Sequence, residues 1–256
     1  MSHGRPGRVN VPSAGCKGRS PGYGALIEPL VVALRRLGPP VFLGLLIVAV
    51  LQPWLIHPRC VDQPTFCDPA QLPAWDRWSL ERHERWAVVA DEALQWSTTA
   101  LALALPVLLP ASTAPRLAGL ARDWLLLTET AAWNWASTEA AQLLVQRPRP
   151  PLFNREVNVK PHDRRSQYTS FWSGHTSYVA AMGAALVLLA RSRGRARLSI
   201  ALTAFAITAT VATAGFRILE GRHFLLDVVA GALAGAVVAL LVARWRRDSP
   251  RAAGLS

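Results

Sequence analysis

The sequence predicts an all-α protein, a polytopic membrane bundle of about six transmembrane helices, and three observations carry this prediction. The 256 residues include several windows of about 20 residues in which charged side chains are almost absent, and a helix of that length crosses the hydrocarbon core of a bilayer. Arginines cluster in the segments that join these windows on one side. Most of the 10 tryptophans lie near window ends, where their rings favour the membrane interface.

The expected helices cover most of the chain. Their windows are residues 37–56, 93–115, 117–145, 171–190, 198–216 and 224–243. The third window carries several charged and amide side chains, so we expect its helix to be the one most enclosed by its neighbours. A large soluble domain with apolar core helices is the alternative, but the stretch 228–242 lacks the polar face that such helices require.

Charge between the windows predicts the orientation of the bundle. Residues 1–36 hold six basic side chains and one acidic one, residues 191–197 hold four arginines, and residues 244–256 hold four arginines and one acid. Six spans place all three segments on the cytoplasmic face, as the positive-inside rule requires, whereas five would leave one of them outside. Residues 57–92, with seven acids and four bases, suit the opposite face. We therefore expect both termini in the cytoplasm.

We expect three regions: a flexible basic cytoplasmic tail at 1–36, a six-helix membrane domain at 37–246 and a short cytoplasmic tail at 247–256. The first residues lack an apolar core, so no cleaved signal peptide is expected. The formal net charge of +12 would by itself suggest a nucleic-acid binder. Because this charge gathers in the predicted cytoplasmic segments, we expect a membrane partner and no nucleic acid. No oligomeric state is predicted.

Two of the three cysteines, Cys60 and Cys67, lie in the segment predicted to face away from the cytoplasm, whereas Cys16 lies in the predicted cytoplasmic tail. An oxidising compartment favours a disulfide between the first two, but their spacing is equally compatible with two free thiols. Three cysteines are too few for a disulfide scaffold.

Three segments predicted to lie outside carry polar side chains that indicate chemistry. Residues 147–165 hold six basic and two acidic side chains, on a face from which positive charge is normally kept. Arginine binds phosphate oxygens through two parallel hydrogen bonds, so an anionic substrate explains this excess; contact with lipid headgroups is the alternative. Ser173, Gly174 and His175 precede the fourth helix, whose N-terminus offers free N–H groups to an anion. A helix cap beside an interfacial histidine is the alternative there.

The third segment, residues 217–227, pairs a histidine with an acid. His223 and Asp227 are four residues apart, so on one helix they share a face and lie within reach of a hydrogen bond. An ionised Asp227 would hold one ring nitrogen as N–H and leave the other with its lone pair for a substrate; the alternative is a pair that only caps the helix. Two histidines and two arginines without a cluster of cysteines or carboxylates favour metal-free phosphoryl transfer, and no cofactor is expected.

These segments carry the pattern of a known family. Gln142-x6-Arg149-Pro150, Trp172-Ser173-Gly174-His175 and Phe216-Arg217-x5-His223-x3-Asp227 resemble the motifs of the type 2 phosphatidic acid phosphatase (PAP2) superfamily, membrane lipid phosphatases related to vanadium haloperoxidases. The family's pattern is Lys-x6-Arg-Pro, then Pro-Ser-Gly-His, then Ser-Arg-x5-His-x3-Asp, and eight positions match while three depart. The resemblance covers roughly residues 75–246 and implies the helical core of that superfamily.

The resemblance implies a role for each matching residue. His223 would attack phosphorus and form a phosphohistidine, Asp227 would orient it, and His175 would protonate the leaving group and then activate water. The phosphoryl oxygens would be bound by Arg149, Arg217, Ser173 and the amide of Gly174, with Gln142 at the position of the family's lysine.

Of the three departures from the family's pattern, Gln142 matters most. A glutamine donates a hydrogen bond to a phosphate oxygen but carries no full charge, so transition-state stabilisation is expected to fall by on the order of a few kcal/mol. We hypothesise that Arg147 or Lys160 folds back to replace the missing cation. Trp172 and Phe216 replace a proline and a serine, which changes the shape of the site and removes one hydroxyl.

The function predicted from these residues is that of a lipid phosphatase at the extracytoplasmic face, with a polyprenyl diphosphate, phosphatidic acid or phosphatidylglycerol phosphate as substrate. Two alternatives stay open. A phosphohistidine does not dictate which acceptor attacks it, so a lipid phosphotransferase is one. A non-catalytic lipid-phosphate binder is the other and would explain Gln142, although simple anion binding needs no pairing of His223 with Asp227.

Overall fold

The computed structural model describes residues 50, 55–56, 67–109, 116–154 and 166–247. Nearly all of the first predicted helix and of the two predicted tails lies outside these residues, as do Cys60 and Lys160. Cys67 is disulfide-bonded, and its partner cysteine also lies outside the described residues.

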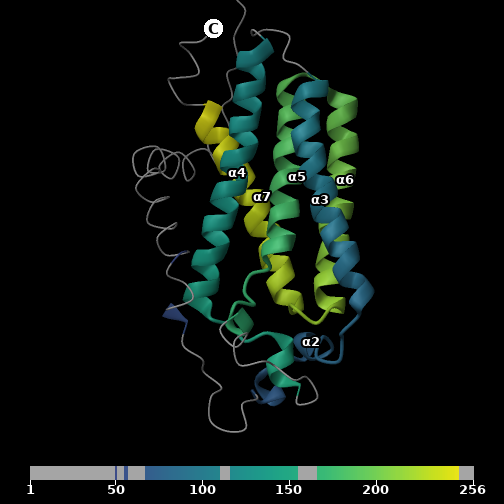
Figure 1. Ribbon diagram of the computed structural model, residues 1–256, viewed down its shortest axis with the longest axis vertical. Helices are drawn as coiled ribbons and strands as arrows, with labels where there is room; N and C mark the ends of the chain where they lie inside the picture. The colour runs from purple at the N-terminus through teal and green to yellow at the C-terminus, as the bar shows by residue number, and fades with distance from the viewer. Residues whose placement is uncertain (1–49, 51–54, 57–66, 110–115, 155–165, 248–256) are drawn as a thin grey trace, which may run out of the picture.

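Five long helices make up the described fold, and the described residues include no strand. The helices are α3 (Arg85–Leu108), α4 (Arg116–Val145), α5 (Gly174–Ser192), α6 (Ala196–Leu219) and α7 (Leu225–Arg247). Shorter elements lie at one end of the bundle: η1 (Pro69–Gln71), α2 (Ala74–Arg77), η2 (Pro150–Phe153) and η4 (Ser166–Tyr168). The all-α prediction is confirmed, and the long helices run side by side along the long axis of the molecule (Figure 1).

Helix α3 begins at Arg85, well before the predicted start at residue 93. The difference arises because Asp91 is buried against α6, where its Oδ2 lies 3.3 Å from Nη1 of Arg217. A buried acid that pairs with a basic side chain is tolerated inside the bundle, so the helix can extend beyond the apolar window. The other four helices begin and end within a few residues of their predicted windows.

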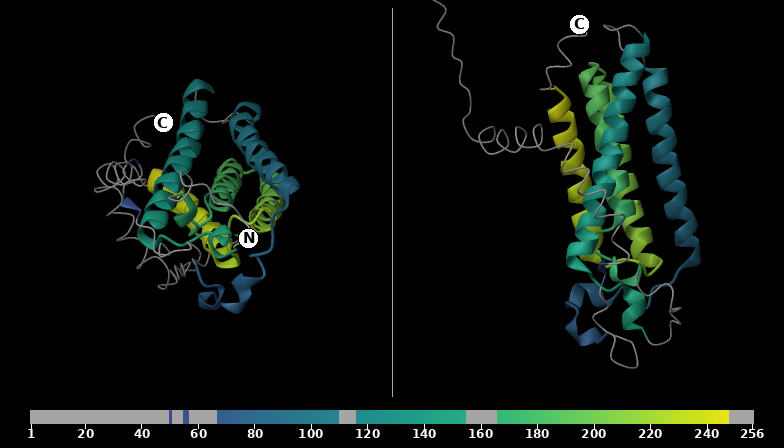
Figure 2. Two further views of the ribbon diagram at one scale, coloured as in Figure 1. Left: turned by 60° about the horizontal axis from the view of Figure 1, so that its bottom comes forward. Right: turned by 60° about the vertical axis from the view of Figure 1, so that its left-hand side comes forward.

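Helix α5 is the centre of the bundle. It packs against α7, α6, α4 and α3, most of its side chains are buried, and Figure 2 shows it inside the ring of its neighbours. Its contact with α7 is close because two glycines face it. A Cβ on Gly235 would lie 2.0 Å from the carbonyl oxygen of Ser177, and one on Gly231 would lie 2.7 Å from that of Ser173. The glycines therefore bring α7 against the first turns of α5.

Replacing Gly235 with alanine is expected to destabilise the protein, because the close contact leaves no space for a methyl group. The carbonyl oxygen of Ser177 belongs to a buried helix and cannot swing aside, and overpacking of this kind costs about 1–3 kcal/mol. Thermal unfolding in detergent measures the effect as a lower Tm. Gly215→Ala is the matched control, since a Cβ at that helical position meets nothing within 4 Å. Equal Tm losses in the two variants would contradict the explanation.

The polar side chains of the third predicted window find partners on neighbouring helices. Asp123 pairs with Arg193, the residue that follows α5. Glu129 accepts two hydrogen bonds from Arg246 of α7, at 2.6 and 2.8 Å. Helix α4 is thereby tied to both neighbours at the end of the bundle opposite the short elements, which explains how an apolar helix carries these charges.

Two of the described helices, α6 and α7, are long and apolar enough to cross a membrane. Large apolar side chains stand exposed along them, among them Ile200, Ile207, Val211 and Leu233. An exposed apolar surface of this kind suggests membrane association. The count of six spans and their orientation stay predictions.

Candidate active site

The antiparallel course of the helices brings the chemistry-bearing segments to one end of the bundle. Helices α4 and α6 end there, whereas α3, α5 and α7 begin there (Figure 1). The site residues predicted from sequence all lie at this end: Gln142 and Arg149 near and after the end of α4, Ser173, Gly174 and His175 at the start of α5, Arg217 near the end of α6, and His223 and Asp227 at the start of α7. The three segments that the sequence assigns to one face are therefore together.

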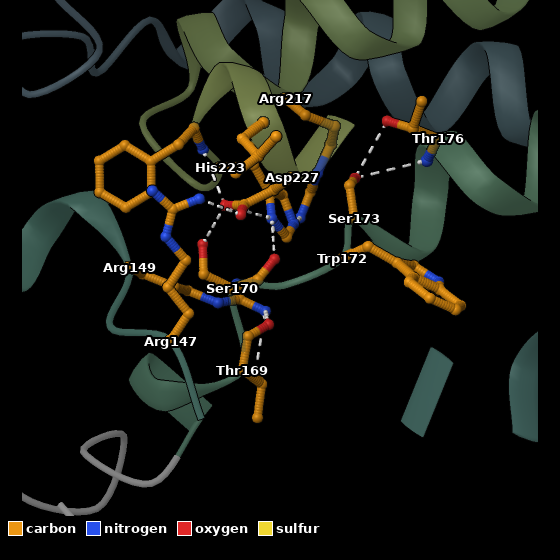
Figure 3. Close-up of polar contacts among 12 residues, drawn as sticks. Arg147, Arg149, Thr169, Ser170, Trp172, Ser173, Thr176, Arg217, His223 and Asp227 are labelled. Carbon is orange, nitrogen blue, oxygen red and sulfur yellow. Dashed lines mark hydrogen bonds and ion pairs between the residues drawn. The ribbon is translucent and has the colours of Figure 1, made fainter. Parts of the chain in front are cut away.

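His223 is 1% exposed, and its two ring nitrogens face different partners (Figure 3). Nδ1 lies 2.8 Å from the carbonyl oxygen of Ser170, and Nε2 lies 3.3 Å from Nη2 of Arg217. A carbonyl oxygen only accepts hydrogen bonds and a guanidinium only donates them. Nδ1 must therefore carry the proton and Nε2 the lone pair, so the surroundings select one neutral tautomer of the imidazole.

The charge state of His223 agrees with this tautomer. Burial lowers the pKa of His223 to about 3, because the imidazolium form would lose its hydration. Asp227 opposes this shift, whereas Arg217 and Arg149 add to it. The imidazole is therefore neutral at pH 7, the state in which a ring nitrogen can act as a nucleophile.

Asp227 is fully buried and accepts hydrogen bonds from three donors. Its Oδ1 accepts from Nη1 of Arg147 at 2.5 Å, and its Oδ2 accepts from the Ser170 hydroxyl at 2.5 Å and from the Phe224 N–H at 3.0 Å. The distance from Oδ2 to Nδ1 of His223 is 3.8 Å, too long for a hydrogen bond. The direct bond expected from the four-residue spacing is not formed. Ser170 instead links the two residues, through its hydroxyl to Asp227 and through its carbonyl to His223.

Arg217 connects His223 to the second histidine through Asp91. Its Nη1 lies 3.3 Å from Oδ2 of Asp91 and also pairs with Glu220. The same Oδ2 lies 3.7 Å from Nε2 of His175, whose side chain is 36% exposed while that of Asp91 is 1% exposed. His175 therefore stands on the accessible side of the cluster, with its Nε2 beside the Asp91 carboxylate.

Arg149 lies beside the site and is partly buried. Its Nη2 donates to the carbonyl and hydroxyl oxygens of Thr169, at 3.3 and 3.2 Å, and its buried Nε has no partner among the described residues. Burial, with a smaller contribution from Arg217, lowers the pKa of Arg149 to about 9. The guanidinium is still charged at pH 7 and keeps donor capacity for an anion.

Ser173 and Gly174 form the start of α5. The Ser173 hydroxyl caps the helix, because its Oγ accepts from the Thr176 N–H at 3.5 Å and lies 3.0 Å from the Thr176 hydroxyl. The cap that the sequence leaves as an alternative is therefore present. Gly174 is the first helical residue, and a Cβ there would meet only the methyl group of Thr138, at 3.4 Å. Its N–H belongs to the helix N-terminus, which attracts anions.

A family model described as the PAP2 superfamily matches residues 123–251, half of the chain. The chain belongs to the PAP2 superfamily. Among curated proteins and solved structures, no match to the chain was found. PAP2 proteins are generally phosphatases, so membership supports the hydrolysis of a phosphoric ester. Within the described parts of this PAP2 chain, no group of three or more histidine, cysteine, aspartate or glutamate side chains is arranged to hold a metal ion.

Gln142 stands where the PAP2 pattern has a lysine. Its Nε2 donates to the carbonyl oxygen of Trp172 at 3.3 Å, so it holds the segment that leads into the cap of α5. Arg147, one of the two cations hypothesised to replace the lysine, instead pairs with Asp227 and Asp76. Its charge is already neutralised by these carboxylates. Lys160, the other hypothesised cation, lies outside the described residues.

Three residues of this PAP2 site are absent from the sequence prediction: Asp76, Asp91 and Ser170. Asp76 and Asp91 precede the matched segment 123–251, and both lie in an acidic stretch that indicates only topology. The signal for Asp91 is an acid two residues before an apolar window, because an acid there needs a partner if it is buried. Ser170 acts partly through its carbonyl oxygen, which no pattern of side chains reveals.

Proposed function

We propose that the protein is an integral membrane lipid phosphatase that removes phosphate from a lipid monoester or diphosphate at the extracytoplasmic face, through a phosphohistidine on His223. A polyprenyl diphosphate, phosphatidic acid or phosphatidylglycerol phosphate is the expected substrate. The observation that carries this proposal is the pair of contacts made by the His223 ring, Nδ1 to the carbonyl of Ser170 and Nε2 to Arg217, because they select the tautomer with its lone pair on Nε2. Simple anion binding needs no such nucleophile.

In the first step, the Nε2 lone pair of His223 attacks phosphorus while the bond from phosphorus to the leaving oxygen breaks. The leaving group, a lipid alcohol or a phosphate, takes its proton from the imidazolium of His175. The His223 ring becomes positive, and the carboxylate of Asp227, 3.8 Å from Nδ1, stabilises that charge. In the second step, neutral His175 takes a proton from water, the water oxygen attacks phosphorus, and the phosphorus–nitrogen bond breaks to restore the lone pair.

Three groups support charge on the phosphoryl oxygens. Arg217 lies 3.3 Å from the attacking Nε2, so its guanidinium is adjacent to any phosphorus bonded there. Arg149 adds a second charged guanidinium, and the N-terminus of α5 adds the Gly174 N–H and the positive end of a helix dipole. Donors that are in place before the reaction stabilise the transition state without reorganising.

The surface of the bundle supports a substrate with a lipid tail. The apolar faces of α6 and α7 would contact the hydrocarbon of a bilayer, and this supports a substrate held in the same membrane. The last turn of α7 carries Arg244, Arg246 and Arg247 at the end of the bundle away from the site. Under the positive-inside rule this end faces the cytoplasm and the site faces out.

A substrate panel tests the proposal. Purified protein in detergent is incubated with polyprenyl diphosphate, polyprenyl phosphate, phosphatidic acid and phosphatidylglycerol phosphate, and free phosphate is measured. We expect release from at least one lipid, and much slower release from a soluble sugar phosphate that lacks a tail. Saturable lipid binding without any release would support the non-catalytic binder. Transfer to an added alcohol without free phosphate would support the phosphotransferase.

Gln142→Lys is expected to raise turnover, because it restores the positive charge of the PAP2 pattern. A lysine keeps a donor for the carbonyl of Trp172, which Gln142 now contacts, and adds charge that stabilises the phosphoryl oxygens. We expect kcat to rise about tenfold, which is less than the change in kcat usually caused by removing one such donor. Gln142→Leu, of similar size but without a donor, should lower kcat. A Gln142→Lys enzyme no faster than wild type would show that this charge is not limiting.

A further inference from the structure

Arg147 bridges two buried carboxylates that come from opposite parts of the chain. Its Nη1 lies 2.5 Å from Oδ1 of Asp227 and its Nη2 lies 2.6 Å from Oδ2 of Asp76. The carboxylates are both 0% exposed, whereas the Arg147 side chain is 16% exposed. Asp76 belongs to α2, and its Oδ1 also accepts from the Leu226 N–H of α7 at 3.5 Å. The short segment before α3 therefore reaches the start of α7.

The bridge continues to the ring of His223. The carbonyl oxygen of Arg147 accepts from the Ser170 N–H at 3.0 Å, while its side chain holds Asp227, which accepts from the Ser170 hydroxyl. The carbonyl of Ser170 in turn accepts from Nδ1 of His223. Arg147 thus fixes Ser170 from two directions, and Ser170 fixes the ring (Figure 3).

The environment of Arg147 indicates a positioning role and not a substrate-binding one. Both ends of its planar guanidinium fork are occupied by carboxylates, and its Cζ lies 4.4 Å from the centre of the Phe224 ring. A buried carboxylate is costly unless it is paired and hydrogen-bonded. Asp76 and Asp227 both pair with Arg147. Their two negative charges offset its positive charge, so Arg147 is not available to bind a phosphate.

We propose that Asp76 and Arg147 are positioning residues for His223, and that they act through Asp227 and Ser170 to hold the ring with Nε2 toward the substrate. Asp76 lies outside the segment that matches the PAP2 superfamily, so the working site includes the segment before α3. The proposal rests on the proposed function where it names His223 as the nucleophile.

Kinetics of four variants test the proposal. Asp76→Asn keeps the size of the side chain but removes the charge that anchors Arg147, and Arg147→Gln removes the bridge. We expect kcat to fall about 10- to 100-fold, as misplacement of a reacting group by an ångström does, with KM within about twofold because no substrate contact is lost. The double variant should be no slower than Arg147→Gln alone, since Asp76 acts through Arg147. Arg147→Lys, a point charge without the fork, should recover only part of the rate.

Asp68→Asn is the matched control, because Asp68 lies on the same segment, is exposed, and uses its side chain to accept from the Ala70 N–H. It should keep the wild-type kcat. Thermal unfolding of each variant separates loss of folded protein from loss of positioning. Wild-type kcat in Asp76→Asn, or independent and multiplicative losses in the double variant, would overturn the proposal.

A second readout does not depend on turnover. In protein with ¹⁵N-labelled histidine, the ring signals of His223 are identified by their absence in His223→Gln, and they report which ring nitrogen carries the proton. We expect the Nδ1–H tautomer in wild type and a mixture of tautomers in Arg147→Gln and Asp76→Asn. If no lipid phosphate is hydrolysed but the tautomer still changes, the proposed function fails and the positioning bridge stands. An unchanged tautomer in both variants refutes the bridge whatever the activity.

Discussion

Replacement of His223 by glutamine is expected to abolish phosphate release, with a loss of at least about 10⁴-fold in kcat. The glutamine amide can still occupy the buried position, but its nitrogen has no available lone pair to attack phosphorus. Free phosphate from the preferred lipid of the wild-type enzyme measures the loss. In parallel, rapid quenching in base with a ³²P-labelled substrate should trap a phosphoenzyme in wild type that is stable in base and lost in acid, and none in the variant.

His83→Gln is the control for this experiment. His83 is exposed and lies at the same end of the bundle, beside the turn at Gly221. It should keep wild-type activity and the trapped phosphoenzyme. Turnover that persists in His223→Gln would refute the nucleophile assignment, while loss of turnover in both variants would indicate a general dependence on this end of the fold.

Replacement of His175 by asparagine is expected to separate the two chemical steps. With an alkyl phosphate lipid, kcat should fall about 10²- to 10⁴-fold because the leaving alkoxide receives no proton. An aryl phosphate such as 4-nitrophenyl phosphate has a leaving group stable enough to depart unprotonated. Its first step should therefore stay fast, and about one equivalent of nitrophenolate per site should appear as a burst, followed by slow hydrolysis of the phosphohistidine.

Tyr178→Phe is the matched control on the same helix, since it removes a hydroxyl that lies 2.8 Å from that of Thr99 and takes no part in the site. Stopped-flow absorbance measures the burst in both variants. Equal losses with alkyl and aryl substrates, and no burst, would show that His175 is not the acid. The 3.7 Å approach of Asp91 would then reflect a structural ion pair.

The sequence predicts the described helices well, because their ends coincide with the ends of long apolar windows wherever local side-chain polarity determines where a helix ends. The start of α3 is the exception, and its cause is a partner far along the chain. Asp91 and Arg217 are 126 residues apart, so a local window counts the acid as a break although the fold neutralises it. The pairing of Arg147 with Asp76, 71 residues apart, cannot be predicted from a local window for the same reason.

The site is predicted in outline from motifs and topology, because the alternation of helices decides which segments meet. Its inner geometry is not. A spacing of four predicts contact between His223 and Asp227, yet Oδ2 of Asp227 already accepts from Ser170 and Phe224 and stays 3.8 Å from the ring. Competition among donors for one carboxylate oxygen can be seen only when all of them are in place.

The link from Ser170 to His223 runs through a main-chain atom, and this makes the site unequally tolerant of change. Any residue at position 170 supplies a carbonyl oxygen, so substitution there can leave the hydrogen bond to Nδ1 in place. Only the hydroxyl that reaches Asp227 depends on the choice of side chain. A substitution at position 170 can therefore leave the tautomer of His223 unchanged, whereas it removes the contact between residue 170 and Asp227 if the new side chain has no hydroxyl.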